Sequence, residues 1–316
     1  MRKDNYSSKP QSMIQNNIPK SLQPGDVITI ISTARAVEKP FIDYAIQLIE
    51  SRGYRVKMGR NLFKKAHQFA GDDKDRLEDL NEAIRDSECK AIFCARGGYG
   101  TARLLHSMDM DALKKNPKWI VGYSDISALL NHIYQVEGIH GIHATMPVNY
   151  KSNTPESIES LFRILESEME EYRFDYQRLN REGNATGEMV GGNLSVIYSL
   201  MGSESQLDTT GKILFIEDLD EYLYHIDRMM IALKRAGMLK NLNGLLIGGM
   251  TDMNDNTTPF GKNAVEIIAE AVAEYDFPVC FGFPAGHIDD NRAWRHGQKI
   301  RLTASSGQPV SIAVIG

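Results

Sequence analysis

The sequence Lys118-Trp119-Ile120-Val121-Gly122-Tyr123-Ser124-Asp125 predicts a strand that passes into a helix with almost no loop. Residues 119–121 form a short apolar run rich in β-forming side chains, which indicates a buried strand. Gly122 would relieve crowding where the backbone turns, and Ser124 stands at the corner. The amphipathic helix beyond the corner is indicated by apolar residues at i, i+3, i+4, i+7 and i+8 spacing, namely Ile126, Leu129, Leu130, Ile133 and Tyr134.

A serine at such a corner points its hydroxyl out of the sheet, and the backbone N–H of Asp125 faces the same space. The N-terminus of the helix behind them favours negative charge. This combination suits a nucleophile, Ser124, beside one donor of an oxyanion hole. Ordinary helix capping by Ser124 or Asp125 is the alternative, and the stretch alone favours it.

Length and composition are those of a globular protein with room for two domains, since the chain has 316 residues, 42% hydrophobic and 24% charged. A net charge of −5 and the lack of a basic block argue against a nucleic-acid partner. No apolar run has membrane-spanning length, and residues 1–20 lack the apolar core of a secretory signal. The three cysteines make no metal-like pair and no even disulfide set. These features predict a cytoplasmic protein without membrane contact, whose cysteines are reduced.

Strands and helices alternate through the first half of the chain, which predicts an α/β fold with a doubly wound, mostly parallel sheet. Ligands of such sheets bind beyond the carboxyl ends of the strands. The alternation breaks in a polar, turn-rich segment, so we place a domain boundary there. We expect a polar N-terminal tail (1–20), a nucleophile domain (21–150), a linker (151–185) and a smaller C-terminal domain (186–316).

The individual elements follow from apolar runs and periodicity. Strands are expected at residues 26–32, 54–58, 91–95, 119–121, 139–144, 213–216, 245–247, 279–283 and twice after Lys299. Helices are expected at residues 42–49, 72–85, 101–107, 222–235 and 264–274, after Ser124, and as a polar helix from residue 151 to acidic residues 166–171. Residues 180–187 are expected to be turns.

A glycine-rich turn, Ala95-Arg96-Gly97-Gly98-Tyr99-Gly100, follows a predicted strand, where a phosphate-binding loop would lie. The dinucleotide fingerprint fails because Arg103 occupies its last small-residue position, and no Walker-type sequence is present. We interpret the turn as the source of a second oxyanion donor, the backbone N–H of Gly98, although a tight turn with positive φ fits as well. Arg96 could attract a substrate carboxylate or form a structural ion pair, and Tyr99 is a further substrate-binding candidate.

A candidate acid follows the strand-like run at residues 211–216. Glu217 ends this run, and a carboxylate at a strand's end can orient an imidazole, as the third member of a catalytic triad does. Capping of the next helix is the alternative for this segment, with Asp218 and Asp220 as good capping residues. Glu221 is the rival acid.

A candidate base is His287, on the glycine-flanked loop Pro284-Ala285-Gly286-His287 beyond a predicted strand. His140 and His143 could form a metal pair, but no acidic or cysteine ligand accompanies them, so we predict no metal site. The remaining histidines singled out as structural are His67, His106, His132 and His225.

Ser124, Glu217 and His287 follow the chain order nucleophile, acid, base of the α/β-hydrolases, but the hydrolase motif G-x-S-x-G is absent because Ile126 replaces its second glycine. Five short motifs instead resemble, in order, those of the LD-carboxypeptidase family, which includes murein tetrapeptide carboxypeptidases and microcin C immunity peptidases. These motifs are Arg96-Gly97-Gly98-Tyr99-Gly100, Gly122-Tyr123-Ser124-Asp125, Gly191-Gly192-Asn193-Leu194, Ile216-Glu217-Asp218 and Gly286-His287. The similarity runs from about residue 24 to residue 302, and residues 72–86 resemble the family's arginine-containing helix.

The resemblance implies a Ser-Glu-His triad of Ser124, Glu217 and His287, with an oxyanion hole made by the backbone of Gly98 and Asp125. It implies an N-terminal domain that is flavodoxin-like and glutaminase-like and carries the serine, and a C-terminal swivelling β/α domain that carries the acid and the base. It also implies a homodimer and no cofactor. Asn193, in the third motif, is a candidate substrate contact.

The function implied by the resemblance is that of a serine carboxypeptidase, which hydrolyses an L,D peptide bond and releases terminal D-Ala from murein tetrapeptide in peptidoglycan recycling. One alternative is an immunity-type serine peptidase or amidase acting on peptidyl- or aminoacyl-nucleotides. A non-catalytic small-ligand-binding protein on the same scaffold is another. After His287 the family usually continues with a glycine- and proline-containing stretch, whereas this chain has Ile288-Asp289-Asp290-Asn291-Arg292-Ala293-Trp294. Arg292 or Trp294 could therefore reshape the substrate pocket.

Overall fold

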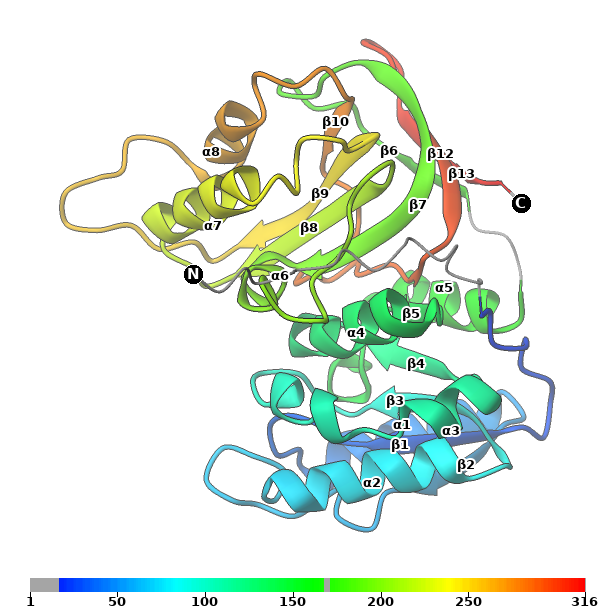
Figure 1. Ribbon diagram of the computed structural model, residues 1–316. Coiled ribbons are helices and arrows are strands. Elements are labelled where there is room, and N and C mark those ends of the chain that lie inside the picture. Colours follow the sequence, from blue (N-terminus) through cyan, green and yellow to red (C-terminus); the bar gives the residue numbers. More distant parts are fainter. Residues whose placement is uncertain (1–16, 168–170, 316) are drawn as a thin grey trace, which may run out of the picture.

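Two sheets, one above the other in Figure 1, organise the computed structural model, which describes residues 17–167 and 171–315. The first has the strand order β11-β5-β4-β3-β1-β2, and the second has the order β10-β9-β8-β7-β12-β13-β6. The expected α/β fold is confirmed. Most of the expected polar tail, residues 1–16, and residues 168–170 of the expected linker lie outside the described ranges.

The first sheet is doubly wound, because successive residues of its buried strands face different helices. Phe93 packs with α1 and α5 on one face, whereas Ile92 packs with α2, α3 and α4 on the other. Its strands are β1 (Val27–Ile31), β2 (Arg55–Met58), β3 (Cys89–Cys94), β4 (Trp119–Gly122) and β5 (Gly141–His143), all parallel, with β11 (Trp294–His296) antiparallel to β5. Its helices are α1 (Lys39–Ser51), α2 (Asp73–Arg85), α3 (Met110–Lys115), α4 (Ser127–Glu137) and α5 (Pro155–Leu165).

Among the described residues, helices pack on one face of the second sheet, where Leu214 and Ile216 contact α6, α7 and α8. On its other face Phe215 packs with residues of β12 and β13 and with Trp294. Its parallel strands are β7 (Gly183–Asn193), β8 (Ile213–Leu219), β9 (Gly244–Thr251) and β10 (Val279–Phe281), and its antiparallel strands are β6 (Glu171–Phe174), β12 (Lys299–Ala304) and β13 (Val310–Val314). Its helices are α6 (Leu194–Ser199), α7 (Leu223–Arg235) and α8 (Ala264–Ala271).

Strand β7 occupies part of the segment that the sequence predicts as turns, and that prediction is wrong. The glycines there serve close strand packing: a Cβ on Gly187 would lie 2.7 Å from the carbonyl oxygen of Gly211, and one on Gly191 would lie 2.0 Å from that of Phe215. The helix expected at residues 101–107 is also replaced, by two short 3₁₀ turns, η1 (Thr101–Arg103) and η2 (Leu105–Ser107).

Helix α5 is amphipathic rather than polar, and it is part of the first sheet's core. Leu161 and Phe162 pack there, and the Tyr54 ring stacks on that of Phe162 at a centroid distance of 5.9 Å. Arg52, at the end of α1, forms an ion pair with Glu159 of α5. The range expected to be a linker therefore holds a helix of the first half and, in β6, a strand of the second sheet.

Strand β11 returns from the second half of the chain to close the edge of the first sheet. Its Trp294 is 1% exposed, and its ring stacks on that of His143 at 5.2 Å and meets that of Phe215 at 5.1 Å. The expectation that Trp294 could reshape a substrate pocket is wrong, because this side chain fills the core between the sheets.

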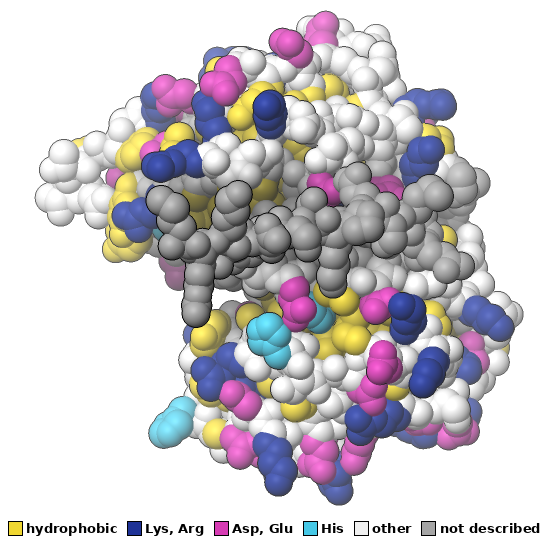
Figure 2. Space-filling model, in the orientation of Figure 1, with side chains coloured by type: hydrophobic (Ala, Val, Ile, Leu, Met, Phe, Trp, Pro, Cys, Tyr) yellow, Lys and Arg dark blue, Asp and Glu magenta, His cyan; other side chains and the backbone are white. Residues whose placement is uncertain are grey.

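Cationic and anionic side chains intermingle on the face in Figure 2, notably over the lower half, where α2 lies in Figure 1. Helix α2 explains part of this pattern through ion pairs such as Lys64 with Asp75 and Arg85 with Asp109. Among the described helices, none has the length and apolar character needed to cross a membrane.

Candidate active site

The corner after β4 holds Ser124 in a strained backbone conformation. Its φ of 63° lies in the left-handed region, which a residue other than glycine rarely adopts and which recurs at functional sites. The chain turns directly into the 3₁₀ turn η3 (Ser124–Ile126) and then into α4. A Cβ on Gly122 would lie 2.9 Å from Cγ1 of Ile126, so the sharp turn requires glycine at this position. The half-buried serine therefore stands at the carboxyl end of a central strand, as the sequence predicts.

The glycine-rich turn after β3 lies directly against this serine. A Cβ on Gly97 would lie 3.1 Å from Oγ of Ser124, so the absence of a side chain lets the turn approach the hydroxyl. The next residue, Gly98, has a φ of 115°. The carboxylate of Asp125 accepts a hydrogen bond from the backbone N–H of Thr101 at 2.9 Å, which ties the turn to the corner. The two segments expected to supply oxyanion donors thus lie side by side.

A carboxylate–imidazole pair lies at the carboxyl end of β8. Oε2 of Glu217 accepts hydrogen bonds from Nδ1 of His287 at 2.7 Å and from the backbone N–H of His287 at 3.2 Å. Burial alone would raise the pKa of the fully buried Glu217, but the charge and hydrogen bonds of His287 hold it below its usual value. Burial alone would lower the pKa of His287, but Glu217 raises it above its usual value. The pair is arranged to stabilise an imidazolium.

Local structure explains why this pair forms. A Cβ on Gly286, whose φ is 106°, would lie 2.7 Å from Oε2 of Glu217, so only glycine lets the loop rest on the acid. The rival Glu221 instead pairs with His225, one turn further along, at 2.5 Å. The structure therefore gives His287 the partner Glu217.

His287 contacts Tyr123, the neighbour of Ser124, across the two halves. The ring of Tyr123 lies 4.8 Å from that of His287, centroid to centroid, at an interplanar angle of 55°. Because Nδ1 of His287 is engaged with Glu217, Nε2 is the nitrogen left to exchange a proton with a serine hydroxyl. The structure thus pairs His287 with Glu217 and places this pair against Tyr123, the residue before Ser124.

The candidate substrate residues have distinct surroundings. Half-buried Arg96 donates to the carbonyl of Ala36 at 3.2 Å and forms no ion pair among the described residues. Tyr99 is 51% exposed, with its ring 6.0 Å from that of Phe69. Asn193 is the N-cap of α6, and its amide donates to Asp218 at 2.8 Å. The Asn193 side chain is thus already bonded to the start of α6 and to Asp218, next to Glu217.

Asp218 and Asp220 do not cap the helix after β8, contrary to that alternative. The N-cap of α7 is Tyr222, which makes no side-chain capping bond. Asp218 instead accepts from the backbone N–H of Ser195 at 2.9 Å, at the start of α6. Burial and the neighbouring Glu217 raise the pKa of Asp218 to about 7.

Two residues that the sequence analysis missed support or border the site. The exposed Arg35 follows β1, and its side chain covers Gly98 so closely that a Cβ there would lie 2.5 Å from its Cδ. Ser127, at the start of α4, accepts at Oγ from the backbone N–H of Asn193 at 3.0 Å and so joins the two halves. The only signal for Arg35 is its place after the carboxyl end of a strand.

A buried histidine cluster, formed by His140, His143 and His296, lies beside the site. The Trp294 ring lies between two of these rings, 5.2 Å from His143 and 5.7 Å from His296. Burial lowers the pKa of His140 and of His143 to about 4 and that of His296 well below its usual value. Within residues 17–167 and 171–315, no group of three or more His, Cys, Asp or Glu side chains could hold a metal ion.

Comparison with known proteins gives matches along nearly the whole chain. The profile of the LD-carboxypeptidase N-terminal domain matches residues 28–144, and that of the LD-carboxypeptidase C-terminal domain matches residues 186–302. A Bacillus subtilis protein named "Probable murein peptide carboxypeptidase" is 33% identical, over 92% of each chain. The muramoyltetrapeptide carboxypeptidase from Oxalobacter formigenes superposes with a TM-score of 0.84 at 25% identity, over 92% of this chain and 99% of that one. The microcin C7 self immunity protein MccF shares the fold at 22% identity, with a TM-score of 0.83 over 95% of this chain and 99% of that one.

Proposed function

Because the chain belongs to the LD-carboxypeptidase family, we propose that it is a serine carboxypeptidase that releases terminal D-alanine from a murein tetrapeptide. Peptidase activity follows from the family. The observation that carries the serine mechanism is the Glu217–His287 pair, which lies against Tyr123, the residue before Ser124. The names of two similar proteins, a murein peptide carboxypeptidase and a muramoyltetrapeptide carboxypeptidase, support the substrate class.

In the proposed reaction, Oγ of Ser124 attacks the carbonyl carbon before the terminal D-alanine while Nε2 of His287 takes the hydroxyl proton. Glu217 stabilises the resulting imidazolium, and the backbone N–H groups of Gly98 and Asp125 stabilise the tetrahedral oxyanion. His287 then gives its proton to the departing amine, which leaves as D-alanine. Water hydrolyses the serine ester by the same proton transfers in reverse and releases the tripeptide.

Two arginines support a substrate that ends in a carboxylate. Arg35 and Arg96 follow β1 and β3, neighbouring parallel strands, so both begin at the carboxyl-end edge where Ser124 lies. A guanidinium forms strong, oriented hydrogen bonds with a carboxylate. We assign the recognition of the D-alanine carboxylate to this pair, with Arg35 as the exposed member.

A second candidate function is hydrolysis of an aminoacyl nucleotide, and the exposed Tyr99 of the glycine-rich turn favours it because an exposed ring can stack on a nucleobase. We further propose that the chain acts in the cytoplasm, as a homodimer, in peptidoglycan recycling. Sedimentation of the purified chain tests the dimer.

The test of function is to incubate the purified chain with tetrapeptides that end in D-alanine or L-alanine and with an aminoacyl-sulfamoyl adenosine. We expect free alanine from the D-terminated peptide only, because a pocket built to bond one arrangement of polar groups rejects the other strongly. Ser124→Ala is the matched control for contaminating peptidase. Equal cleavage of both peptides would contradict the stereochemistry, and turnover of the nucleotide alone would favour the second candidate.

A further inference from the structure

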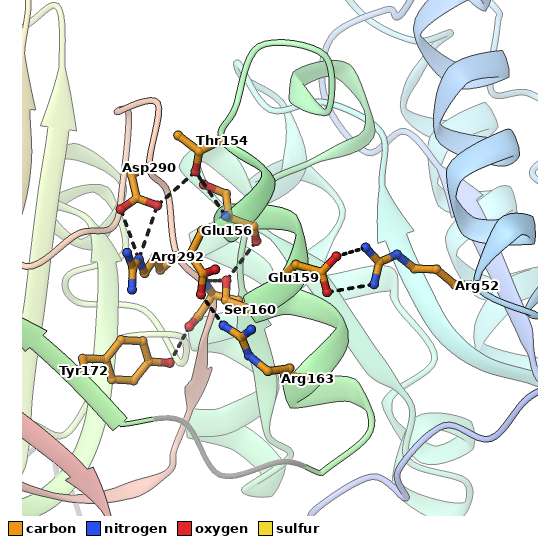
Figure 3. A network of polar contacts seen from close by, with 11 residues as sticks. Arg52, Thr154, Glu156, Glu159, Ser160, Arg163, Tyr172, Asp290 and Arg292 are labelled. Atoms are coloured by element: carbon orange, nitrogen blue, oxygen red, sulfur yellow. Dashed lines mark hydrogen bonds and ion pairs between the residues drawn. The ribbon is translucent and has the colours of Figure 1, made fainter.

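The segment after His287 leaves the second sheet and crosses to the first half. Residues 288–293 run along the N-terminal part of α5 before β11 joins the first sheet (Figure 3). In this view Thr154 contacts Asp290, Arg292 folds back onto Asp290, and Tyr172 reaches over from β6. Residues 288–293, which we call the strap, are thus hydrogen-bonded to the first half after leaving the second.

The strap is held by the start of α5. The carbonyl of Asp289 accepts hydrogen bonds from the backbone N–H of Thr154 at 2.9 Å, from Nδ2 of Asn153 at 3.0 Å and from Oγ of Ser157 at 3.1 Å. A helix N-terminus offers N–H groups that lack partners within the helix, so a carbonyl from elsewhere is well placed there. Further along, Oγ of Ser160 accepts from the backbone N–H of Ala293 at 2.9 Å.

Among the contacts that the first half makes with the strap, those of Asn153 lie nearest to His287 in the chain. Its amide nitrogen donates to the carbonyls of Ile288, at 3.2 Å, and Asp289, the two residues that follow His287. Its side-chain oxygen accepts from Oγ1 of Thr145, just beyond the end of β5, at 2.5 Å. One half-buried side chain therefore connects the first sheet to the residues directly after the base.

His287 is consequently tied on two sides. On one side it is bound to the second half. Glu217 accepts a hydrogen bond from its ring, and Thr251 donates one to its backbone carbonyl at 3.0 Å. Downstream, Asn153 binds the Ile288 carbonyl and shares the Asp289 carbonyl with Thr154 and Ser157, which connects His287 to the half that carries Ser124. The first set of bonds orients the imidazole toward its acid, and the second fixes its position relative to the nucleophile.

We propose that Asn153 is a positioning residue that sets the spacing between His287 and Ser124 by holding the Ile288 and Asp289 carbonyls. The proposal rests on the serine mechanism proposed above and not on the identity of the peptide. A misplacement of about 1 Å in an aligned catalytic pair costs on the order of 100-fold in rate. The effect belongs in the chemical step, because Asn153 holds the base through its backbone.

The experiment compares Asn153→Ala and Asn153→Asp with the matched control Ser152→Ala, an exposed neighbour whose side chain, among the described residues, bonds only within its own turn, to Asn149. Asn153→Asp keeps the acceptor for Thr145 but replaces the donor to both carbonyls with an oxygen. We measure the rate at which a fluorophosphonate labels Ser124, kcat and KM for the tetrapeptide, the melting temperature, and the His287 pKa by NMR. Labelling needs no peptide, so a labelled but peptide-inert wild type would contradict the proposed substrate alone.

We expect both Asn153 variants to lose about 10- to 100-fold in labelling rate and in kcat, with KM within about twofold and Ser152→Ala unchanged. The raised His287 pKa should persist, because its bonds to Glu217 lie within the second half. Wild-type labelling in either variant would overturn the proposal. A His287 pKa that falls together with activity would also overturn it, since Asn153 would then support the imidazole–acid pair itself.

Discussion

Replacing Glu217 with glutamine should slow the chemical step about 10³-fold while leaving the site's shape intact. In the wild type one oxygen, Oε2, takes both hydrogen bonds from His287, whereas buried Oε1 has no hydrogen-bond partner among the described residues. A glutamine can place its side-chain oxygen where Oε2 lies, so that it still accepts both hydrogen bonds, and its amide nitrogen where Oε1 lies. The change therefore removes the charge and keeps both hydrogen bonds to His287, while it buries an amide nitrogen that has no acceptor among the described residues.

The magnitude follows from the contact distance. With Nδ1 of His287 2.7 Å from Oε2 of Glu217, the two charge centres are roughly 4 Å apart, and unit charges at that separation attract by about 4 kcal/mol at an effective dielectric constant near 20. That attraction is present only when the imidazole carries the serine's proton, so its loss raises the barrier. At about 1.4 kcal/mol per tenfold, 4 kcal/mol corresponds to a factor of about 10³.

The pH profile should move as well. Burial alone would lower the pKa of His287, and Glu217 raises it above its usual value, so wild-type activity should be lost as the pH falls through that raised pKa. In Glu217→Gln, burial is opposed only by the weaker attraction of Asp218, so the pKa falls and the acid limb of kcat/KM moves to lower pH. The variant should be slower and yet retain its activity further into acid.

Steady-state rates over a pH series check both parts, with Glu221→Gln as the matched control because its carboxylate pairs with His225. If the acid limb of kcat/KM in Glu217→Gln stays at the same pH or moves to higher pH, the electrostatic account is refuted. A crippling effect of Glu221→Gln beside a silent Glu217→Gln would refute the choice of acid.

Ser124→Ala should abolish turnover, by several orders of magnitude in kcat, without changing the melting temperature; near-wild-type turnover in the purified variant would disprove the nucleophile. Arg35→Met should raise KM for the tetrapeptide more than Arg96→Met does, because Arg35 is exposed whereas Arg96 is half-buried and bonded to a carbonyl; unchanged KM in both would remove them from substrate binding. The buried histidine cluster is neutral in the folded state, so its histidines take up protons when the chain unfolds at a pH between about 6.5 and 4. The free energy of unfolding should therefore drop by about 1.4 kcal/mol per pH unit for each histidine as the pH falls through that range. Urea midpoints across that range check this, and His143→Phe should flatten the slope.

The sequence was sufficient where local pattern determines structure. Buried strands such as β4 are unbroken apolar runs, and helices such as α2 carry both an apolar face and a capping box, at Asp72 and Asp75. The site candidates were found by the same means, because each follows a strand in an α/β sheet. That rule places each candidate at the carboxyl-end edge of its own sheet, and their catalytic roles stay predictions.

Pairings between distant segments could not be read in this way. Three-residue β11 carries no strand signal, and its place in the first sheet depends on partners such as Asn131, which lies 165 residues from His296. The glycines of β7 indicate turns in the sequence, because the close approach of the neighbouring backbone, which requires them, is visible only in the structure. The spacing of Ser124 and His287 depends on such long-range contacts as well.

Strand β11 also bears on how the protein is made. A ribosome delivers the strands up to β5 early, but the strand that closes that edge emerges only after β6 to β10. Throughout that interval the growing chain presents the open edge of β5, which can pair with other chains. A fragment that stops before residue 294 would keep this edge, so we expect it to aggregate rather than to behave as a free N-terminal domain.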